Sequence, residues 1–425
     1  MKLKKKRITA ILSLLLVLLI NASVLAAPAA SNPAEPSING LSAITIDLET
    51  NEIIYEKSID QKMYPASTTK LLTALLLAES KKKTDLLTYT ASAKSQPEFS
   101  MNLNLKPIAV GETMSAKDVM LGLLLYSGND AAYMAADNVS GNNTAFMAKM
   151  NEKIASLGLK GTHFVTPNGL HDANHYTTAY DLSIIGKAAF ANEWVREAMG
   201  TKQATITTSG GASMLVENRN KLLGLDGCIG GKTGYTSNAG KCLVAVYERD
   251  GRKILGVVLS SVYDAEDTFV FNDMKEIIDY SYAMKQTTLH AADSVVKTEK
   301  ITYKPLLIMG PEKTLDVPLI AKTDVKYYEN DVNKTELKET YKLNDIKLST
   351  LTGSKSIATM TVTVRDSVQN YEVFSSLSVF DLVKANILFY AGLLAGLAIL
   401  IAIIVIIIKK IRGGRRRGRG RTYYY

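Results

Sequence analysis

Ser67 and Lys70 are three residues apart at the start of an apolar helical pattern, and this pair could carry out nucleophilic chemistry. A serine hydroxyl becomes a good nucleophile only when a nearby base removes its proton. A lysine amine can be that base if burial or neighbouring cations lower its pKa. Residues three apart on a helix share a face, and a helix that begins at Ser67 directs backbone N–H groups toward the reacting centre. The same spacing recurs at residues 80–83, where polar neighbours predict a solvated helix end.

A second hydroxyl and an amide follow in the segment Tyr126-Ser127-Gly128-Asn129, where another helical pattern starts. The Ser127 hydroxyl could carry a proton toward a leaving nitrogen. The Asn129 amide could bond both to the catalytic lysine and to a carbonyl of a substrate backbone. Serine and asparagine are also favoured helix N-caps, so capping is the competing interpretation. Residues 140–142 repeat the Ser-Gly-Asn triplet in a polar loop, after which we expect no helix start.

The third motif, Gly-Gly-Lys-Thr-Gly-Tyr-Thr at residues 230–236, is predicted to lie on an edge strand. Glycines before and within a strand allow a substrate backbone to lie alongside as an added strand. Lys232 offers a positive charge to a substrate carboxylate, and Thr233 places a hydroxyl beside it. The backbone N–H groups of Ser67 and Tyr235 could be two oxyanion donors. An ordinary glycine-bearing hairpin is the alternative interpretation.

Strand and helix patterns predict the elements that must position these motifs. A hairpin over residues 42–57 precedes a helix from about residue 67, on which leucines recur at helical spacing. The elements that follow are mostly helical segments at 115–160 and 178–199, a β-meander at 228–236, 241–247 and 253–260, and a closing helix at 264–285. This order predicts an α/β sandwich with an antiparallel sheet. Residues 290–375 show short Val/Ile/Thr/Leu-rich runs, which predict a small all-β domain.

The 425-residue chain has room for two or three domains, and its charge is unevenly distributed. Five basic residues lie in residues 1–26 and eight in residues 409–425, with no acidic residue in either segment. Because the whole chain carries +9, these thirteen charges leave −4 for residues 27–408. A mildly acidic body argues against a nucleic-acid-binding protein.

Each basic segment adjoins an apolar run, and this pattern indicates a membrane address. An apolar run followed by small residues predicts a secretory signal peptide over residues 1–26, with a retained anchor as the alternative. The uncharged residues 385–408 would form a helix about 36 Å long, enough to span a lipid bilayer. The positive residues 409–425 then predict a cytoplasmic tail, with the body of the chain outside the cytoplasm.

The three motifs, in this order, resemble those of low-molecular-mass penicillin-binding proteins that act as serine-type D-alanyl-D-alanine carboxypeptidases. The segments that carry the resemblance are Tyr64-Pro-Ala-Ser-Thr-Thr-Lys70, Tyr126-Ser-Gly-Asn-Asp-Ala-Ala132, residues 164–182, and Gly231-Lys-Thr-Gly-Tyr-Thr236 with Ala239-Gly240. The resemblance covers roughly residues 37–375, and the C-terminal anchor also fits. One departure is Tyr235, where many relatives have histidine. Since the oxyanion donor there is a backbone N–H, we expect little loss.

The resemblance implies a serine β-lactamase/transpeptidase-like catalytic domain at residues 37–289, after a linker at 27–36 and before the all-β domain at 290–375. It implies removal of the terminal D-alanine from peptidoglycan stem peptides, with no cofactor, and covalent inhibition by β-lactams. Ser67 would be acylated and Lys70 would be its base. The other implied roles are Ser127 as proton shuttle, Asn129 in the same network, and Lys232, Thr233 and Gly234 in binding the substrate's terminal carboxylate.

Other functions remain open beside this one. A class A β-lactamase would need a deacylating glutamate after the second motif, and residues 153–192 contain none. A transpeptidase or endopeptidase would share the acyl-enzyme step. A non-catalytic wall-binding or antibiotic-sensing receptor is disfavoured by the complete set of motifs and by the short tail after the anchor.

Two residue pairs suggest further chemistry. His171 and His175 are four apart, a spacing that suits zinc on a helix. The proline and glycine just before them favour a loop that borders the active site, with no metal. Cys228 and Cys242 are the only cysteines, and they would face each other if the hairpin turned about Tyr235. We therefore hypothesise a disulfide between them in an oxidising compartment.

Overall fold

The computed structural model describes residues 32–417, apart from residues 98, 307–309, 345, 347–349 and 354 and the side chains of 413–417. The predicted signal peptide, residues 27–31 of the predicted linker and residues 418–425 of the predicted tail therefore lie outside the described residues. The chain divides into two compact units. Of the described residues, one unit contains those up to Ile46 and Ile54–Lys285, and the other contains Asp47–Ile53 and those from Gln286 onward.

The first unit is built on a five-stranded sheet with the strand order β2-β1-β9-β8-β7. Its strands are β1 (Ser42–Asp47), β2 (Ile53–Lys57), β7 (Cys228–Thr236), β8 (Gly240–Arg249) and β9 (Arg252–Ser261). β7 pairs antiparallel with β8, and β8 pairs antiparallel with β9, so the predicted β-meander is confirmed. Residues 242–247 of β8 and 254–259 of β9 are all buried, because both strands have apolar residues on both faces.

Helices cover both faces of this sheet. Gly186 of α8 (Ala179–Ala191) packs closely on Leu255, since a Cβ at the glycine would lie 3.0 Å from the leucine side chain. Gly256 packs on α10 (Phe269–Ala283), where a Cβ would lie 2.5 Å from Met274 Sδ. Successive residues of a strand point to opposite faces, so α8 and α10 lie on opposite sides of the sheet. The predicted α/β sandwich is thereby confirmed.

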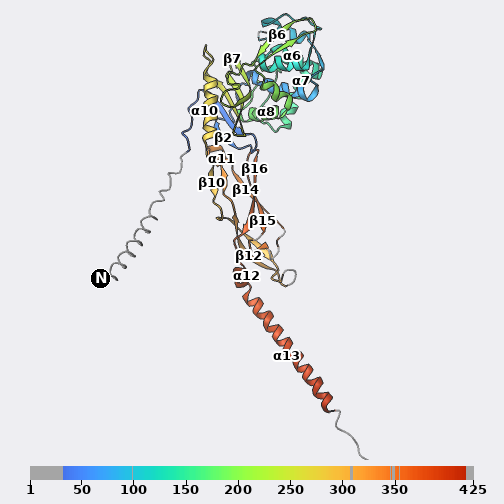
Figure 1. Cartoon of the computed structure of the whole chain (residues 1–425), viewed down its shortest axis with the longest axis vertical. Helices are drawn as coiled ribbons and strands as arrows, with labels where there is room; N and C mark the ends of the chain where they lie inside the picture. Colours follow the sequence, from blue (N-terminus) through green and yellow to red (C-terminus); the bar gives the residue numbers. More distant parts are fainter. Residues whose placement is uncertain are drawn as a thin grey trace, which may run out of the picture. The chain divides into compact units, whose positions relative to one another are not determined.

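The other helices of the first unit pack on α6 or on α2 (Lys70–Ser80), whose residues 70–77 are all buried. They are α3 (Ala91–Lys94), α4 (Met101–Asn104), α5 (Ala116–Leu121), α6 (Asn129–Ser140), α7 (Asn143–Ser156) and α9 (Glu193–Met199). Figure 1 shows α6, α7 and α8 close together, in cyan and green. Asn142 caps α7 by accepting the Ala145 N–H at 2.9 Å, so the expectation of no helix start there is wrong.

Two short strand pairs complete the first unit. β3 (Leu86–Thr88) pairs antiparallel with β4 (Thr113–Ser115), and β5 (Gln203–Thr207) pairs antiparallel with β6 (Ser213–Glu217). The β5–β6 hairpin matters for the site because the loop that follows it carries Arg219, which is described below.

The second unit contains a five-stranded antiparallel sheet with the order β11-β12-β16-β15-β14. Its strands are β11 (Val295–Tyr303), β12 (Lys313–Ala321), β14 (Lys338–Leu343), β15 (Ser356–Val364) and β16 (Ser367–Ser375). β10 (Thr287–His290) and β13 (Val325–Tyr327) pair separately. Buried side chains such as Val317, Met360 and Val373 form its core. The predicted all-β region is confirmed, with the short helix α11 (Asp331–Glu336) as an addition.

Two helices follow the second sheet. α12 (Val379–Ala385) begins with a capping box in which Ser378 and Asp381 satisfy each other's backbone N–H groups. α13 runs over Ile387–Arg417, and its segment Ile387–Arg412 is long and apolar enough to cross a membrane. None of its 18-residue apolar window is buried inside the protein, unlike the core helix of a soluble domain. Only its start contacts the second unit, where Tyr390 Oη donates to the Pro305 carbonyl oxygen at 3.2 Å.

Candidate active site

Ser67 lies in a tight turn that leads into α2. Residues Ala66–Thr69 form a 3₁₀ turn, and the α-helix proper begins at Lys70, slightly later than predicted. Ala66 is buried and has a left-handed φ of 47°. A neighbouring loop presses on this turn, since a Cβ at Gly169 would lie 2.0 Å from the Ala66 carbonyl oxygen. Close packing on both sides therefore fixes the backbone that carries the Ser67 hydroxyl.

The Lys70 side chain is fully buried, and its Nζ atom contacts three oxygens. It donates to Ser67 Oγ at 2.8 Å, to Asn129 Oδ1 at 3.0 Å and to the Asn168 carbonyl oxygen at 2.8 Å. Burial, and then the positive charge of Arg219, lower the pKa of Lys70 to about 7. A large share of the Lys70 amine is thus neutral near neutral pH, where it can accept a proton from Ser67.

The second motif follows the end of α5. Residues Gly122–Tyr126 widen into a π turn, Ser127 adopts a left-handed φ of 73°, and α6 starts at Asn129. The break turns the Ser127 hydroxyl toward the third motif, where Lys232 Nζ donates to Ser127 Oγ at 2.8 Å. The contact that the sequence predicted between Asn129 and the lysine of the first motif is present.

Lys232 is the second buried lysine of the site, with 1% of its surface exposed. Its Nζ also donates to the Thr233 carbonyl oxygen at 2.8 Å. Burial, followed by the charges of Lys70 and Arg219, holds the pKa of Lys232 well below its ordinary value. A carboxylate that binds beside this amine would favour its charged form, because an opposite charge raises the pKa of a lysine.

Strand β7 passes directly beside the turn that carries Ser67. A Cβ at Gly234 would lie 3.0 Å from both the Ser67 nitrogen and the Pro65 carbonyl oxygen, so a glycine is needed at this crossing. β7 is the terminal strand of the sheet and pairs with β8 along one edge. Thr233, Gly234 and Tyr235 line the site, as expected of an edge strand that can receive a peptide.

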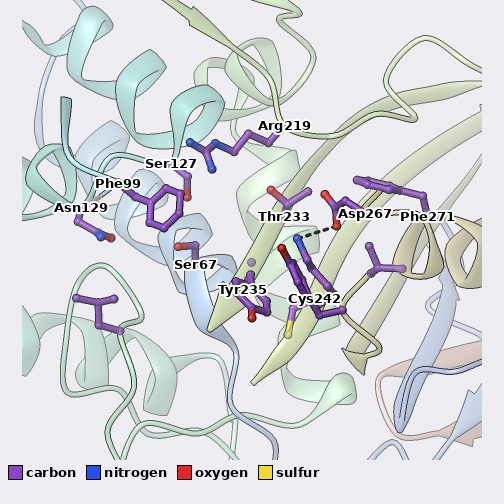
Figure 2. A pocket seen from close by; sticks show the side chains of 15 residues that line it. Ser67, Phe99, Ser127, Asn129, Arg219, Thr233, Tyr235, Cys242, Asp267 and Phe271 are labelled. Carbon is purple, nitrogen blue, oxygen red and sulfur yellow. Dashed lines mark ion pairs between the residues drawn. The ribbon is translucent and has the colours of Figure 1, made fainter. Parts of the chain in front are cut away.

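A cavity of about 260 Å³ opens between the three motifs. Figure 2 shows the side chains that line it. Six of the predicted catalytic and substrate-binding residues line it, namely Ser67, Ser127, Asn129, Thr233, Gly234 and Tyr235. The other lining residues are Phe99, Leu170, Arg219, Lys241, Cys242, Tyr263, Asp267, Val270 and Phe271. Lys70 and Lys232 are buried behind this lining, where each bonds to one of its serines. The structure thus brings all the predicted catalytic and substrate-binding residues together.

Arg219 is a site residue that the sequence did not reveal. Its guanidinium carbon lies 5.1 Å from the ring centroid of Phe99 and 4.9 Å from that of Tyr126, which places a cation at the cavity wall. A single arginine in a polar loop gives no periodic or motif signal, and its ring partners come from distant segments. Asn168 was also missed, because its contribution to Lys70 is a backbone carbonyl rather than a side chain.

His171 and His175 have separate surroundings. His175 is buried, and its Nδ1 accepts the Val165 N–H at 3.0 Å, so its Nε2 carries the proton and donates to Thr69 Oγ1 at 2.9 Å. Burial lowers the pKa of His175 to about 3, which keeps it neutral. His171 packs edge-on against the Tyr64 ring at 4.6 Å. In the part of the chain that the structure describes, no three His, Cys, Asp or Glu side chains could hold a metal ion together.

The disulfide predicted between Cys228 and Cys242 is wrong, because both are free, buried thiols. The hairpin turns at residues 237–239 rather than about residue 235, which sets Cys242 opposite Gly234 and Cys228 opposite Tyr247. Burial raises the pKa of the Cys228 thiol, and it raises that of Cys242 to about 12. Neither thiol is therefore a nucleophile at neutral pH.

A serine with a buried lysine one turn away, beside a strand edge open to a peptide, is the arrangement of an active-site-serine peptidase. Comparison with known families identifies the peptidase family. The model of the family described as D-alanyl-D-alanine carboxypeptidase, peptidase S11, matches residues 29–262. The chain belongs to this family.

Individual relatives agree with this assignment. The chain is 29% identical over 301 residues to the D-alanyl-D-alanine carboxypeptidase DacF of Bacillus subtilis, which covers 69% of this chain and 75% of that protein. It is 31% identical over 280 residues to a D-alanyl-D-alanine carboxypeptidase of Streptomyces strain K15, with coverage of 63% and 95%.

Solved structures also resemble the chain. The crystal structure of the Streptomyces K15 DD-transpeptidase matches with a TM-score of 0.54 at 28% identity, over 59% of this chain and 100% of that one. A D-alanyl-D-alanine carboxypeptidase from Mycobacterium tuberculosis matches with a TM-score of 0.55 at 28% identity, over 60% and 96%. These matches confirm the predicted fold class and the family resemblance of the three motifs.

Proposed function

We propose that this chain is a serine-type carboxypeptidase that removes the terminal D-alanine from peptidoglycan stem peptides through an acyl-enzyme on Ser67. The observation that carries the proposal is the 2.8 Å contact between Ser67 Oγ and the buried Lys70 Nζ, since the pKa of Lys70 is lowered to about 7. A base with this pKa suits proton abstraction at neutral pH. Family membership and the names of the relatives supply the substrate class.

Substrate binding would use the edge of β7. The peptide would lie along Thr233–Tyr235 as an added strand, with its terminal carboxylate near Lys232 and the hydroxyls of Thr233 and Ser127. Gly234 leaves room for this backbone beside Ser67. The Asn129 amide, whose oxygen accepts from Lys70 at 3.0 Å, would donate its N–H to a carbonyl of the peptide.

Acylation would then transfer one proton from Ser67 to Lys70 and on to the leaving nitrogen. Neutral Lys70 accepts the Ser67 proton as Oγ attacks the carbonyl carbon between the last two D-alanines. The backbone N–H groups of Ser67 and Tyr235 stabilise the resulting oxyanion. When the carbon–nitrogen bond breaks, protonated Lys70 gives up this proton, and the Ser127 hydroxyl passes it to the leaving nitrogen, so Lys70 is neutral again. Ser127 Oγ accepts from Lys232 Nζ at 2.8 Å, which holds the hydroxyl in the site.

Deacylation would return the enzyme to its starting state. A water molecule attacks the ester carbonyl carbon and gives its proton to Lys70, and Ser67 leaves with a proton as the shortened peptide is released. A β-lactam would acylate Ser67 in the same way. Its ring-opened leaving group stays covalently attached, so we expect slow deacylation and therefore inhibition.

Transfer of the acyl group to an amine is a second candidate, favoured by the similarity to a structure described as a DD-transpeptidase. The acyl-enzyme would be the same, and an amino group would replace water as the acceptor. Addition of glycine or a D-amino acid to the reaction separates the two activities. Formation of the new peptide in excess over hydrolysis would favour transpeptidation.

The C-terminal helix supports a proposal for the location of the enzyme. We propose that Ile387–Arg412 anchors the chain in the cell membrane, with the basic residues after it in the cytoplasm and the catalytic unit outside. The signal peptide at residues 1–26 would direct this export. The all-β region at residues 290–375 would act as a spacer between the membrane and the catalytic domain.

The full-length chain in detergent micelles tests the proposed activity. It should release D-alanine from a peptide that ends in D-Ala-D-Ala, and Ser67→Ala should abolish the release. Ser80→Ala is a matched control, because Ser80 begins the second Ser-x-x-Lys sequence but is exposed at the end of α2. It should retain the wild-type rate. Wild-type turnover by Ser67→Ala would disprove the assignment of the nucleophile.

A further inference from the structure

A cluster of two tyrosines and an ion pair lies at one end of the active-site cavity, and its side chains take no part in the acylation steps above. It consists of Tyr235, Lys241, Tyr263 and Asp267, all of which line the cavity, and it is called the tyrosine–ion-pair cluster below. Lys241 Nζ lies 2.7 Å from Asp267 Oδ1. The same Nζ is 4.8 Å from the ring centroid of Tyr235 and 5.0 Å from that of Tyr263.

The cluster is held in place by the sheet and by an anchored loop. Lys241 on β8 stands opposite Tyr235 on β7, which sets the two side chains next to each other. The loop that carries Asp267 is fixed by Lys221, whose Nζ donates to the carbonyl oxygens of Glu266 at 2.7 Å and Asp267 at 3.2 Å. Figure 2 shows Tyr235 and Asp267 on the same side of the cavity, together with the ion pair. The cluster is thus formed without a substrate.

The aromatic part of the cluster is open to a ligand. The two rings stack with their centroids 4.8 Å apart. Even so, 41% of the surface of Tyr235 and 56% of that of Tyr263 are exposed. Exposed aromatic side chains beside a cavity are typical of a recognition surface, because their rings offer apolar area at little cost in side-chain entropy.

The direction of the bound peptide identifies which of its residues meets the cluster. The proposed function places the terminal carboxylate at Lys232 and the carbonyl under attack at the Tyr235 N–H. The peptide must then continue past Tyr235 toward the end of β7. A strand advances about 3.3 Å per residue, so the third residue from the C-terminus lies roughly 7 Å from the last one. Its side chain comes beside the cluster.

We propose that the tyrosine–ion-pair cluster is the subsite for the side chain of this third residue, and that it selects a side chain ending in both an ammonium and a carboxylate. The proposal rests on the proposed function. Lys241 would attract the carboxylate and Asp267 the ammonium, while the methylene stem packs on the tyrosine rings. A side chain with a single charge would gain one attraction but meet one like charge, so it fits this pair less well.

Four peptides of the form acyl-X-D-Ala-D-Ala test the proposal on the full-length chain in detergent. X is a diaminopimelic acid residue with both charges, lysine with the ammonium alone, an aminopimelic acid residue with the carboxylate alone, or norleucine with neither. The readout is kcat/KM for D-alanine release. We expect the doubly charged peptide to exceed the norleucine peptide by about tenfold or more, with the singly charged peptides between them.

Variants connect this preference to the cluster. Lys241→Met and Asp267→Asn should each reduce the ratio of the two kcat/KM values to less than about threefold, whereas Lys241→Arg, which keeps the charge, should preserve most of it. Lys275→Met is the matched control, because it removes an exposed lysine paired with Asp279 on α10. It should leave the ratio unchanged. Acylation by a fluorescent penicillin reports whether each variant has a folded site.

The outcomes separate this proposal from the proposed function. Equal kcat/KM for the four peptides with the wild-type chain would overturn the proposed subsite while leaving the carboxypeptidase activity intact. Because this series uses the wild-type chain alone, it tests the proposal even if a variant fails to fold. An undiminished ratio in both Lys241→Met and Asp267→Asn would also overturn it. If no peptide releases D-alanine, the proposed function fails first.

Discussion

Two buried lysines dominate the chemistry at the scale of single residues. Lys70 and Lys232 each contact a serine at 2.8 Å, and burial lowers the pKa of both. The positive charge of Lys70 also disfavours protonation of Lys232, so the site can hold neutral amines that accept a proton. One lysine can then act as the base for Ser67, and the other can become a cation when a substrate carboxylate arrives.

The lowered pKa of Lys70 predicts how acylation depends on pH. A base with a lowered pKa is neutral above that value and protonated below it. The acylation rate constant with a fluorescent penicillin should therefore be nearly constant above pH 8 and should fall as the pH drops through about 7. At pH 5 we expect a loss of about 100-fold, because only about 1% of Lys70 is then neutral. A rate constant independent of pH between 5 and 8 would contradict this role for Lys70.

Arg219 should set the position of that profile. Its charge is the second cause of the low pKa of Lys70, so Arg219→Gln should raise this pKa and shift the profile to higher pH by roughly 0.5 to 1 pH unit. Arg249→Gln removes an arginine of β8 that pairs with Asp279, and it should not move the profile. An unshifted profile in Arg219→Gln would show that its charge does not act on Lys70.

At the scale of secondary-structure elements, the site depends on how closely β7 approaches the turn before α2. Gly234→Ala would place a Cβ 3.0 Å from the Ser67 nitrogen and force the two elements apart. We expect the acylation rate constant to fall by at least about 100-fold, since small displacements of reacting groups have effects of this size. Circular dichroism should show a folded protein.

A second glycine provides the comparison for this prediction. Gly111 has a φ of +96° and no neighbouring atom within 4 Å of an added Cβ. Gly111→Ala should lower the free energy of unfolding by about 1 kcal/mol through backbone strain alone. It should not change acylation. Equal acylation by the two alanine variants would contradict the importance of the crossing at Gly234.

The sequence predicted most elements of the first unit and the residues of its three motifs. Motif order and apolar spacing sufficed because each motif lies on one short element, as with Ser67 and Lys70 at the start of α2. The turn of the β7–β8 hairpin was misplaced by a few residues, and a shift of this size changes every cross-strand partner. Cys228 and Cys242 were therefore paired wrongly. Arg219 and the Asn168 carbonyl came from loops, whose positions depend on tertiary packing.

At the scale of the whole molecule, the C-terminal helix is the membrane anchor that we propose. Expressed from the full sequence, the protein should remain in the membrane pellet after washes with high salt and alkaline carbonate, and detergent should extract it. A chain that ends before residue 386 lacks α13 and should appear in the soluble fraction with penicillin acylation intact. Carbonate-resistant membrane binding of the shortened chain would show that another segment anchors it.

The central claim is that Ser67 is the residue acylated during turnover. Mass spectrometry of the full-length chain after brief reaction with a penicillin tests it most directly. We predict a mass increase of one penicillin per chain, located on the proteolytic peptide that contains Ser67 and absent from the Ser67→Ala variant. An adduct on any other peptide, or one that persists in Ser67→Ala, would contradict the account.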